Sequence, residues 1–154
     1  MNRNRSVVAG AVFGVVGMAV GLVCPVAAQT AVTWEVKRSG HWIRNGLGVD
    51  FDDRKVSDRN VDLQLVERGL VCNGCTIAEL PGGRNDFDRI SAVPIDGYVD
   101  SLSVAATKLV IVRLADGRYA KLLVEAPQYD PASASPNGAG ITVTYVLSHP
   151  DASW

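Results

Sequence analysis

The segment Lys108–Ala126 constrains the fold of this chain more than any other. Two stretches rich in β-branched and large apolar residues flank the pair Asp116-Gly117. That pair favours a two-residue type I′ turn, because both central residues of such a turn need a positive φ. Both faces of the two strands become apolar away from the turn, which is typical of strands inside a sheet. The segment therefore predicts a β-hairpin in the middle of a sheet.

A two-residue turn also predicts the register of this hairpin. Lys108 would stand opposite Glu125, which is a favourable cross-strand charge pair. Lys121 would stand opposite Val112, with its stem over apolar surface and its amine in water.

Four other segments alternate apolar and polar residues, which is the period of a half-buried strand. They are Val32–Lys37, with Val32, Trp34 and Val36 on one face, Leu47–Asp52, Val61–Leu65 and Ile141–Leu147. The only helical turn that we expect lies around Asp100–Ala106, and a small-residue loop spans 127–140. The pattern predicts an all-β domain, a single small β-sandwich or barrel-like antiparallel sheet.

Residues 1–28 have the pattern of a cleaved secretory signal peptide. Arg3 and Arg5 precede an apolar and glycine-rich run, Val7–Val23, and the small residues of Val26-Ala27-Ala28 follow. We expect cleavage between Ala28 and Gln29, which leaves one domain, 29–154, in the periplasm or secreted.

Two other uses of this leader are disfavoured. An uncleaved membrane anchor would contain four glycines in a run that only just reaches spanning length, so the mature form is not expected to span a membrane. A lipoprotein modified at Cys24 would need a small residue where Val23 stands. Loss of two arginines with the leader leaves 13 basic against 16 acidic residues, a net charge of about −3. A slightly acidic domain offers no excess of basic residues to bind the phosphates of a nucleic acid.

Cys72-Asn73-Gly74-Cys75 holds the only thiols that remain after cleavage. In an oxidising compartment the spacing favours a local disulfide across an Asn-Gly turn, between strands on either side. A redox dithiol would need a helix that opens at the first cysteine, and a zinc site would need two further ligands.

The only two histidines are His41 and His149, one near each end of the mature domain. Each is either a surface residue or, if the chain ends approach one another, a ligand of a metal or of haem iron. Trp42, beside His41, would suit a flat apolar ligand or the edge of a core.

No catalytic residue is predicted, because neither histidine has a triad context and no GxSxG or HExxH motif occurs. The acidic run Asp50, Asp52, Asp53, Asp58 and Asp62 lacks the ligand positions of an EF-hand and is interrupted by basic residues. We interpret it as a solvated turn between strands.

Two stretches together resemble the HmuY family of secreted bacterial haem-binding proteins. The first comprises Val49-Asp50-Phe51-Asp52, Lys55-Val56 and Val61–Leu65, with Asn73-Gly74 near the place of a similar pair in that family. The second comprises Val110–Leu122, similar to a hairpin that ends in Asp-Gly-Lys-Tyr-x-Lys, and the closing strand Gly140–Tyr145.

The resemblance implies an all-β binding protein rather than an enzyme, with haem or another apolar ligand as its partner. Val61 stands where the family has a tryptophan, and the family's haem-ligating histidines do not map onto His41 or His149. His41 and His149 are therefore candidates because they are the only imidazoles. The competing interpretation is a cell-envelope structural or protein-interaction module without a small ligand. Tyr119 and Tyr145 are the alternative iron ligands, as phenolates.

Overall fold

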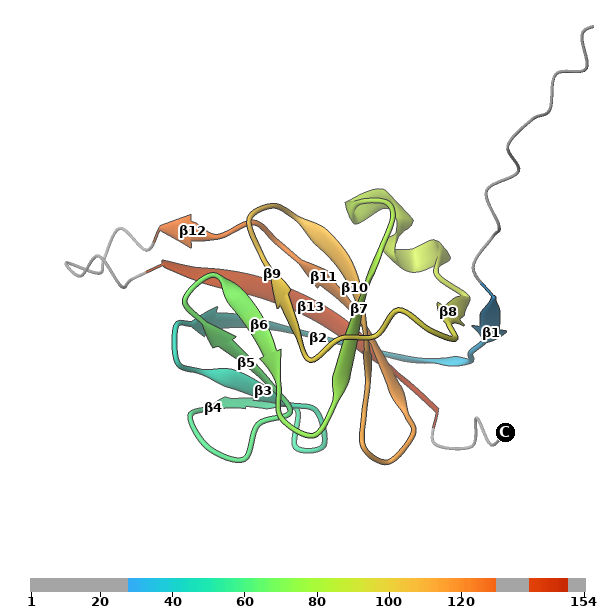
Figure 1. The fold of residues 1–154 in the computed structure, drawn as a ribbon, viewed down its shortest axis with the longest axis horizontal. Coiled ribbons are helices and arrows are strands. Elements are labelled where there is room, and N and C mark those ends of the chain that lie inside the picture. The colour runs from blue at the N-terminus through green and yellow to red at the C-terminus, as the bar shows by residue number, and fades with distance from the viewer. Residues whose placement is uncertain (1–27, 130–138, 150–154) are drawn as a thin grey trace, which may run out of the picture.

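The computed structural model describes residues 28–129 and 139–149. Two antiparallel sheets pack face to face, and a two-stranded ladder and one short helix lie at the side of the larger sheet (Figure 1). The all-β class predicted from the alternating segments is confirmed, and the arrangement is an open sandwich with no closed barrel among the described strands.

The larger sheet has six strands in the order β12-β13-β11-β10-β7, with β2 paired to the other side of β13. These strands are β2 (Trp34–Arg44), β7 (Thr76–Leu80), β10 (Lys108–Arg113), β11 (Tyr119–Val124), β12 (Gln128–Tyr129) and β13 (Ala139–Ser148). The hairpin β10–β11 lies in the middle of this sheet, as its two apolar faces predict.

The smaller sheet has five strands in the order β4-β3-β5-β6-β9. They are β3 (Gly48–Asp50), β4 (Lys55–Ser57), β5 (Leu63–Val66), β6 (Gly69–Cys72) and β9 (Ser101–Ser103). The separate ladder pairs β1 (Gln29–Ala31) with β8 (Ala92–Pro94), and the 3₁₀ helix η1 covers Arg84–Arg89.

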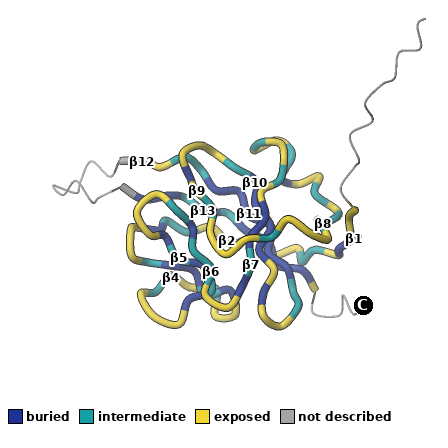
Figure 2. The backbone as a smooth tube through the Cα atoms, in the orientation of Figure 1, coloured by how far each residue is buried: buried dark blue, intermediate teal, exposed yellow. Residues whose placement is uncertain are grey.

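The main core lies between the two sheets, and Figure 2 shows the long buried stretches of the central strands. Alternate residues of each strand point into it, as the period of two requires. Fully buried members include Val49, Leu63, Val110, Val112, Leu122 and Val143. The opposite, outer face of the six-stranded sheet carries two smaller clusters that pack against η1 and β8.

The register of the β10–β11 hairpin differs from the prediction by one residue. The backbone N–H of Leu114 donates to Arg118, and Ala115-Asp116-Gly117 forms the loop, with φ +87° at Gly117. A three-residue loop of this kind ends in a left-handed glycine that forms a bulge. Lys121 therefore stands opposite Ile111, on the outer face.

The predicted cross-strand pair between Lys108 and Glu125 is absent for the same reason, because Lys108 stands opposite Val124. The Lys108 ammonium instead donates to Glu79 on β7 at 2.6 Å. Glu125 pairs with Arg84 of η1.

The predicted burial of Val36 beside Val32 and Trp34 is wrong. Val36 is fully exposed, while Val32 is buried. The pairing shifts between Val146 and Ser148 of β13, where β2 has more residues than β13, so β2 bulges outward at Val36.

Two further sequence expectations need correction or fall outside the description. The segment around Asp100–Ala106 contains strand β9 rather than a helical turn, and η1 was not foreseen. The predicted leader up to residue 27 and loop residues 130–138 lie outside the described residues. Within 28–129 and 139–149, no helix has the length and hydropathy needed to cross a membrane.

Candidate ligand-binding groove

A groove of about 620 Å³ lies on the outer face of the six-stranded sheet. Its floor is formed by outward-facing residues of β2, β11 and β13, and its wall by η1. The lining residues are Arg38, Leu123, Glu125 and Thr144 from the sheet side, and Arg84, Asn85, Phe87, Asp88 and Arg89 from η1. The volume falls within the roughly 300–1,000 Å³ of small-molecule sites. A second hollow, between Leu65, Val104 and Ile141 at one end of the sandwich, has only about 260 Å³.

Lys121 does not line this groove; it lies against the inner lining residue Phe87, with 5% of its surface exposed. Its Nζ is 5.1 Å from the ring centroid of Phe87 and 5.1 Å from that of Trp34. Its Nζ donates a hydrogen bond to the carbonyl oxygen of Ile90, at 3.5 Å. Burial lowers the pKa of Lys121; Arg38 also lowers it, and Asp88 opposes that shift. An ammonium in such a place is costly, because no described carboxylate forms an ion pair with it.

The charged rim of the groove connects η1 to the sheet. Arg38 of β2 forms an ion pair with Asp88, and Arg84 forms one with Glu125 after β11. The Arg38 guanidinium also lies 5.0 Å from the centroid of Phe87, so two cations contact one ring. Asp88 is the only described carboxylate that offsets both, and 75% of its side chain is exposed. Two of the three arginines that line the groove are therefore already paired with carboxylates.

His41 lies on the opposite, inner face of the same sheet. Its imidazole stacks on Tyr145, with ring centroids 5.8 Å apart, and Phe51 meets Tyr145 edge-on. Tyr145 is fully buried, and burial raises the pKa of its phenol. The Nε2 of His41 is buried, and no described residue hydrogen-bonds to it.

The structure does not bring the two histidines together. His41 pairs with Val143, whereas His149 follows Ser148 and donates its backbone N–H to Thr33. His149 lies six positions after Val143 along the chain, which is roughly 20 Å at the rise of a β-strand. Metal–nitrogen bonds are only about 2 Å long, so one iron cannot take both imidazoles.

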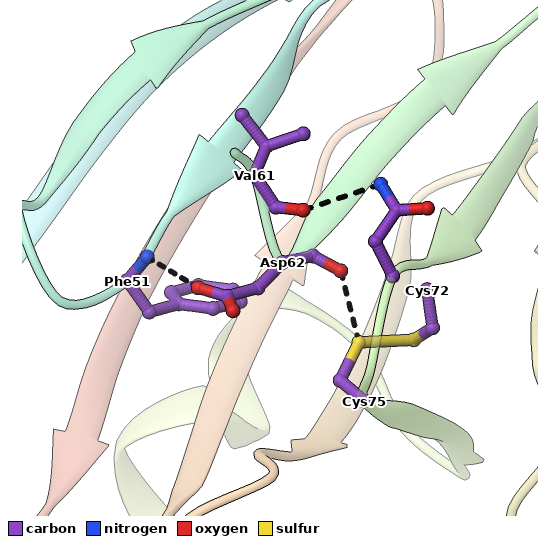
Figure 3. Close-up of a disulfide and its surroundings, with 6 residues drawn as sticks. Phe51, Val61, Asp62, Cys72 and Cys75 are labelled. Atoms are coloured by element: carbon purple, nitrogen blue, oxygen red, sulfur yellow. Dashed lines mark hydrogen bonds between the residues drawn. A yellow bond between two sulfur atoms is a disulfide. The ribbon is translucent and has the colours of Figure 1, made fainter. Parts of the chain in front are cut away.

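Cys72 and Cys75 lie at disulfide-bonding distance, with their Cα atoms 5.1 Å apart. They span the turn that carries the chain from β6 in one sheet to β7 in the other, as Figure 3 shows. The turn docks on Val61 and Asp62: Asn73 donates its side-chain amide to the Val61 carbonyl, and Cys75 Sγ lies 3.1 Å from the Asp62 carbonyl. Strands flank the pair on both sides, as predicted.

The acidic residues between Asp50 and Asp62 form hydrogen bonds and ion pairs with neighbouring residues. Asp50 accepts a hydrogen bond from the backbone N–H of Asp53, and Asp62 accepts one from Phe51. Asp52 pairs with Arg118 of the central hairpin's loop. The described part of the chain contains no group of three or more histidine, cysteine or acidic side chains arranged to hold a metal.

The sequence interpretation missed the groove. It recognises Lys121 as the odd residue of an apolar strand but pairs it with Val112, whereas the structure pairs it with Ile111. A three-residue loop, which glycine at position 117 also permits, gives the observed pairing. The short helix that forms the wall has no apolar periodicity, and only its central Phe87 is buried.

Comparisons with known proteins identify a similar fold but do not identify the functional site. No protein-family model matches the chain, and no curated protein matches it. A solved structure from Bacteroides vulgatus, described as a "putative HmuY_like heme binding protein", matches with a TM-score of 0.51 and 16% identity. The match covers 75% of this chain and 96% of that one. The chain thus has an HmuY-like all-β fold, which supports the resemblance seen in the sequence.

Proposed function

We propose that this protein is an exported, non-enzymatic binding protein for haem or another apolar ligand. The observation that carries this proposal is the likeness to the HmuY-like structure over nearly the whole of that chain. The groove of about 620 Å³ supports it, because the cavity has the size of a small-molecule site.

The lining of the groove is mainly polar. Its two apolar residues, Phe87 and Leu123, are buried. Two of its arginines, Arg38 and Arg84, already form ion pairs with carboxylates. Its lining residues include no histidine, cysteine, methionine or tyrosine that could bind iron in the usual way. Ligation of one iron by both histidines does not fit the structure, so no step is derived through it.

His41 and His149 remain separate candidates for a single axial ligand. His149 is exposed at the end of β13, where a ligand could reach it. His41 has a buried nitrogen without a described partner, but it lies between the sheets beside Tyr145.

Titration with haemin tests the ligand. Protein recovered from the producing cell should bind haemin saturably, with a shift of the Soret band. His41→Ala and His149→Ala are then titrated separately, and a true axial ligand changes the spectrum in only one of them. Unchanged spectra in both variants would remove the imidazoles as ligands, and the absence of any saturable shift would remove haem.

Export is a separate part of the proposal. N-terminal sequencing of the recovered protein should begin at Gln29 or within a residue or two, because β1 begins there and the small residues precede it. Full-length chain in the cytoplasm would contradict export. Nucleic acid is not a proposed partner, given the slightly acidic mature chain.

The alternative is a cell-envelope or protein-interaction module without a small ligand. Four large apolar residues of the described part are exposed: Val36, Val66, Ile95 and Val99. Single exposed apolar residues are normal on a protein surface, whereas a docking face needs a contiguous patch.

A further inference from the structure

We infer that Gln29 is a modification site: in the mature protein it is converted to pyroglutamate by attack of its new α-amine on its own side-chain amide. The inference rests on the export proposed above, because cleavage between Ala28 and Gln29 makes Gln29 the first residue of the chain. The fold then presents a first residue whose nitrogen and side chain are both free to react.

The reaction is intramolecular and needs no co-reactant. The unprotonated α-amine forms a bond to the Cδ of the Gln29 side chain, and the bond between Cδ and the amide nitrogen breaks. Ammonia leaves with the proton that the amine gives up, and a five-membered lactam remains. The product is about 17 Da lighter, the mass of the ammonia lost, and its terminus carries no charge.

The first support is the direction of the Gln29 nitrogen in the β1–β8 ladder. Val32 donates its backbone N–H to the carbonyl of Ser91, and Ile95 donates its own to Ala28. Along an antiparallel ladder, pairs that exchange hydrogen bonds alternate with pairs that do not. The hydrogen-bonded positions of this ladder are therefore 28, 30 and 32. Gln29 falls between two of them, so its nitrogen points away from β8.

The residue opposite Gln29 agrees with this geometry. Gln29 pairs with Pro94 in β8, and proline has no N–H to donate to a ladder. Strands tolerate a proline where its nitrogen faces away from the neighbouring strand. Among the described strands, β1 pairs only with β8. The nitrogen of Gln29 thus faces an unpaired strand edge, and lactam formation breaks no hydrogen bond of the ladder.

The second support is the surroundings of Gln29. The residue is exposed, and it lines a hollow of about 210 Å³ together with Leu80, Pro81 and Arg89. Arg89 is the one charged side chain in the described lining of this hollow. The lining therefore offers no carboxylate to a new α-ammonium, and cyclisation removes a positive charge from a residue that neighbours another cation.

Mass spectrometry of the protein recovered from the producing cell tests the inference. Trypsin should release Gln29–Lys37 as the N-terminal peptide, about 17 Da below its calculated mass as the main form. Because a lactam has no primary amine, the intact protein should resist Edman degradation. Removal of the lactam by pyroglutamyl aminopeptidase should then give a sequence that begins at Thr30.

Two controls separate this modification from handling. A synthetic peptide Gln29–Lys37 taken through the same digestion measures the lactam that forms during preparation, and it should stay mostly uncyclised. Gln29→Ala keeps the small residues before the cleavage site but has no side-chain amide. That variant should be recovered at its calculated mass with an N-terminus that Edman degradation can read.

A rate comparison tests the role of β1. A chain that begins at Gln29, freshly released from an N-terminal fusion by a protease, is kept with the synthetic peptide at one pH and temperature. The loss of ammonia is followed by mass, and circular dichroism monitors the fold. Because the nitrogen has no partner in the ladder, the folded chain should cyclise within about three-fold of the rate of the peptide. A rate about ten-fold lower or less would mean that β1 holds the nitrogen, and would overturn the inference from the ladder.

The outcomes distinguish this inference from the export on which it rests. A recovered chain that begins at Gln29 with a free amine would overturn the pyroglutamate and leave export intact. A chain that begins at a neighbouring residue would also exclude the lactam while export stands. Full-length chain in the cytoplasm would contradict both.

Discussion

The two faces of the six-stranded sheet are built from the same strands and have opposite character. On the inner face, Leu122 is fully buried in the core that joins the two sheets. On the outer face, the neighbouring residue Lys121 carries a charge into a cluster with Trp34 of β2 and Phe87 of η1. One residue along β11 thus separates a position that stabilises the fold from a position that costs free energy.

Leu122 lies on the inner face of the sheet and Leu123 on the outer face. Truncation of each to alanine should give the largest difference in unfolding free energy between the two faces. Leu122→Ala should lower the free energy of unfolding by about 3–5 kcal/mol, because the cavity would be sealed between two sheets. Leu123→Ala should cost less, about 2 kcal/mol, because Leu123 also lines the groove and the space can fill with water. Urea denaturation of both variants measures these values. Equal losses would mean that the outer face is packed as tightly as the core.

How much of this difference could be read from the sequence depends on the register of one hairpin. The alternation of Val49, Leu63 and Val143 with polar neighbours predicted the inner face correctly. The outer face was missed because Asp116-Gly117 fits a two-residue turn as well as the three-residue loop that forms. A one-residue error in register exchanges the partners of every residue, so Lys121 was assigned to Val112 instead of Ile111.

The turn that carries Cys72 and Cys75 belongs with the inner face of the six-stranded sheet, since it joins β6 of one sheet to β7 of the other. Replacement of both Cys72 and Cys75 by serine should lower the free energy of unfolding by about 2 kcal/mol, because so short a loop constrains the unfolded chain only modestly. Mass spectrometry without reductant should show the wild-type pair joined. Rapid alkylation of both thiols before reduction would contradict this. Haemin affinity should not change, because neither cysteine lines the groove.

The Lys121→Met variant measures how much the buried charge of Lys121 lowers the free energy of unfolding. The variant should unfold with a free energy equal to that of the wild type or up to about 1 kcal/mol higher at pH 7, because it removes a buried charge without an ion pair. Burial lowers the native-state pKa of Lys121 below 10.5. Between that lowered value and 10.5 the unfolded chain holds more protons, so wild-type stability should rise with pH over this range.

The groups that face Lys121 are Arg38 from β2 and Asp88 from η1, and neither changes charge across that range. The advantage of the Met variant should therefore shrink as the pH approaches 10.5, which urea denaturation at several pH values would detect. A constant difference would mean that Lys121 titrates like an exposed lysine. A large loss of stability in the variant would mean that the aromatic contacts of the ammonium outweigh its burial.

The candidate site shows a second limit of sequence-based prediction. His41 and His149 were chosen because they are the only imidazoles, and composition carries no information about which face of a sheet a residue occupies. The groove residues come from three strands and a helix that are distant in the sequence. Their convergence depends on the β2–β13 pairing and on the position of η1, which no local pattern specifies.

The smallest effect is expected at Val36, where strict alternation predicted a buried residue and the structure has a fully exposed one. Val36 lies where β2 bulges away from β13, so its side chain contributes no apolar burial. Val36→Ser should change the free energy of unfolding by less than about 0.5 kcal/mol, since surface substitutions away from packed features are nearly neutral. Val32→Ser, in the same predicted strand but buried in an outer-face cluster, serves as the matched comparison and should cost about 2 kcal/mol or more. Thermal and urea unfolding of the pair measure the difference. If Val36→Ser were as damaging as Val32→Ser, the bulge would be wrong, and the alternation read from the sequence would describe β2 better than the irregular pairing with β13.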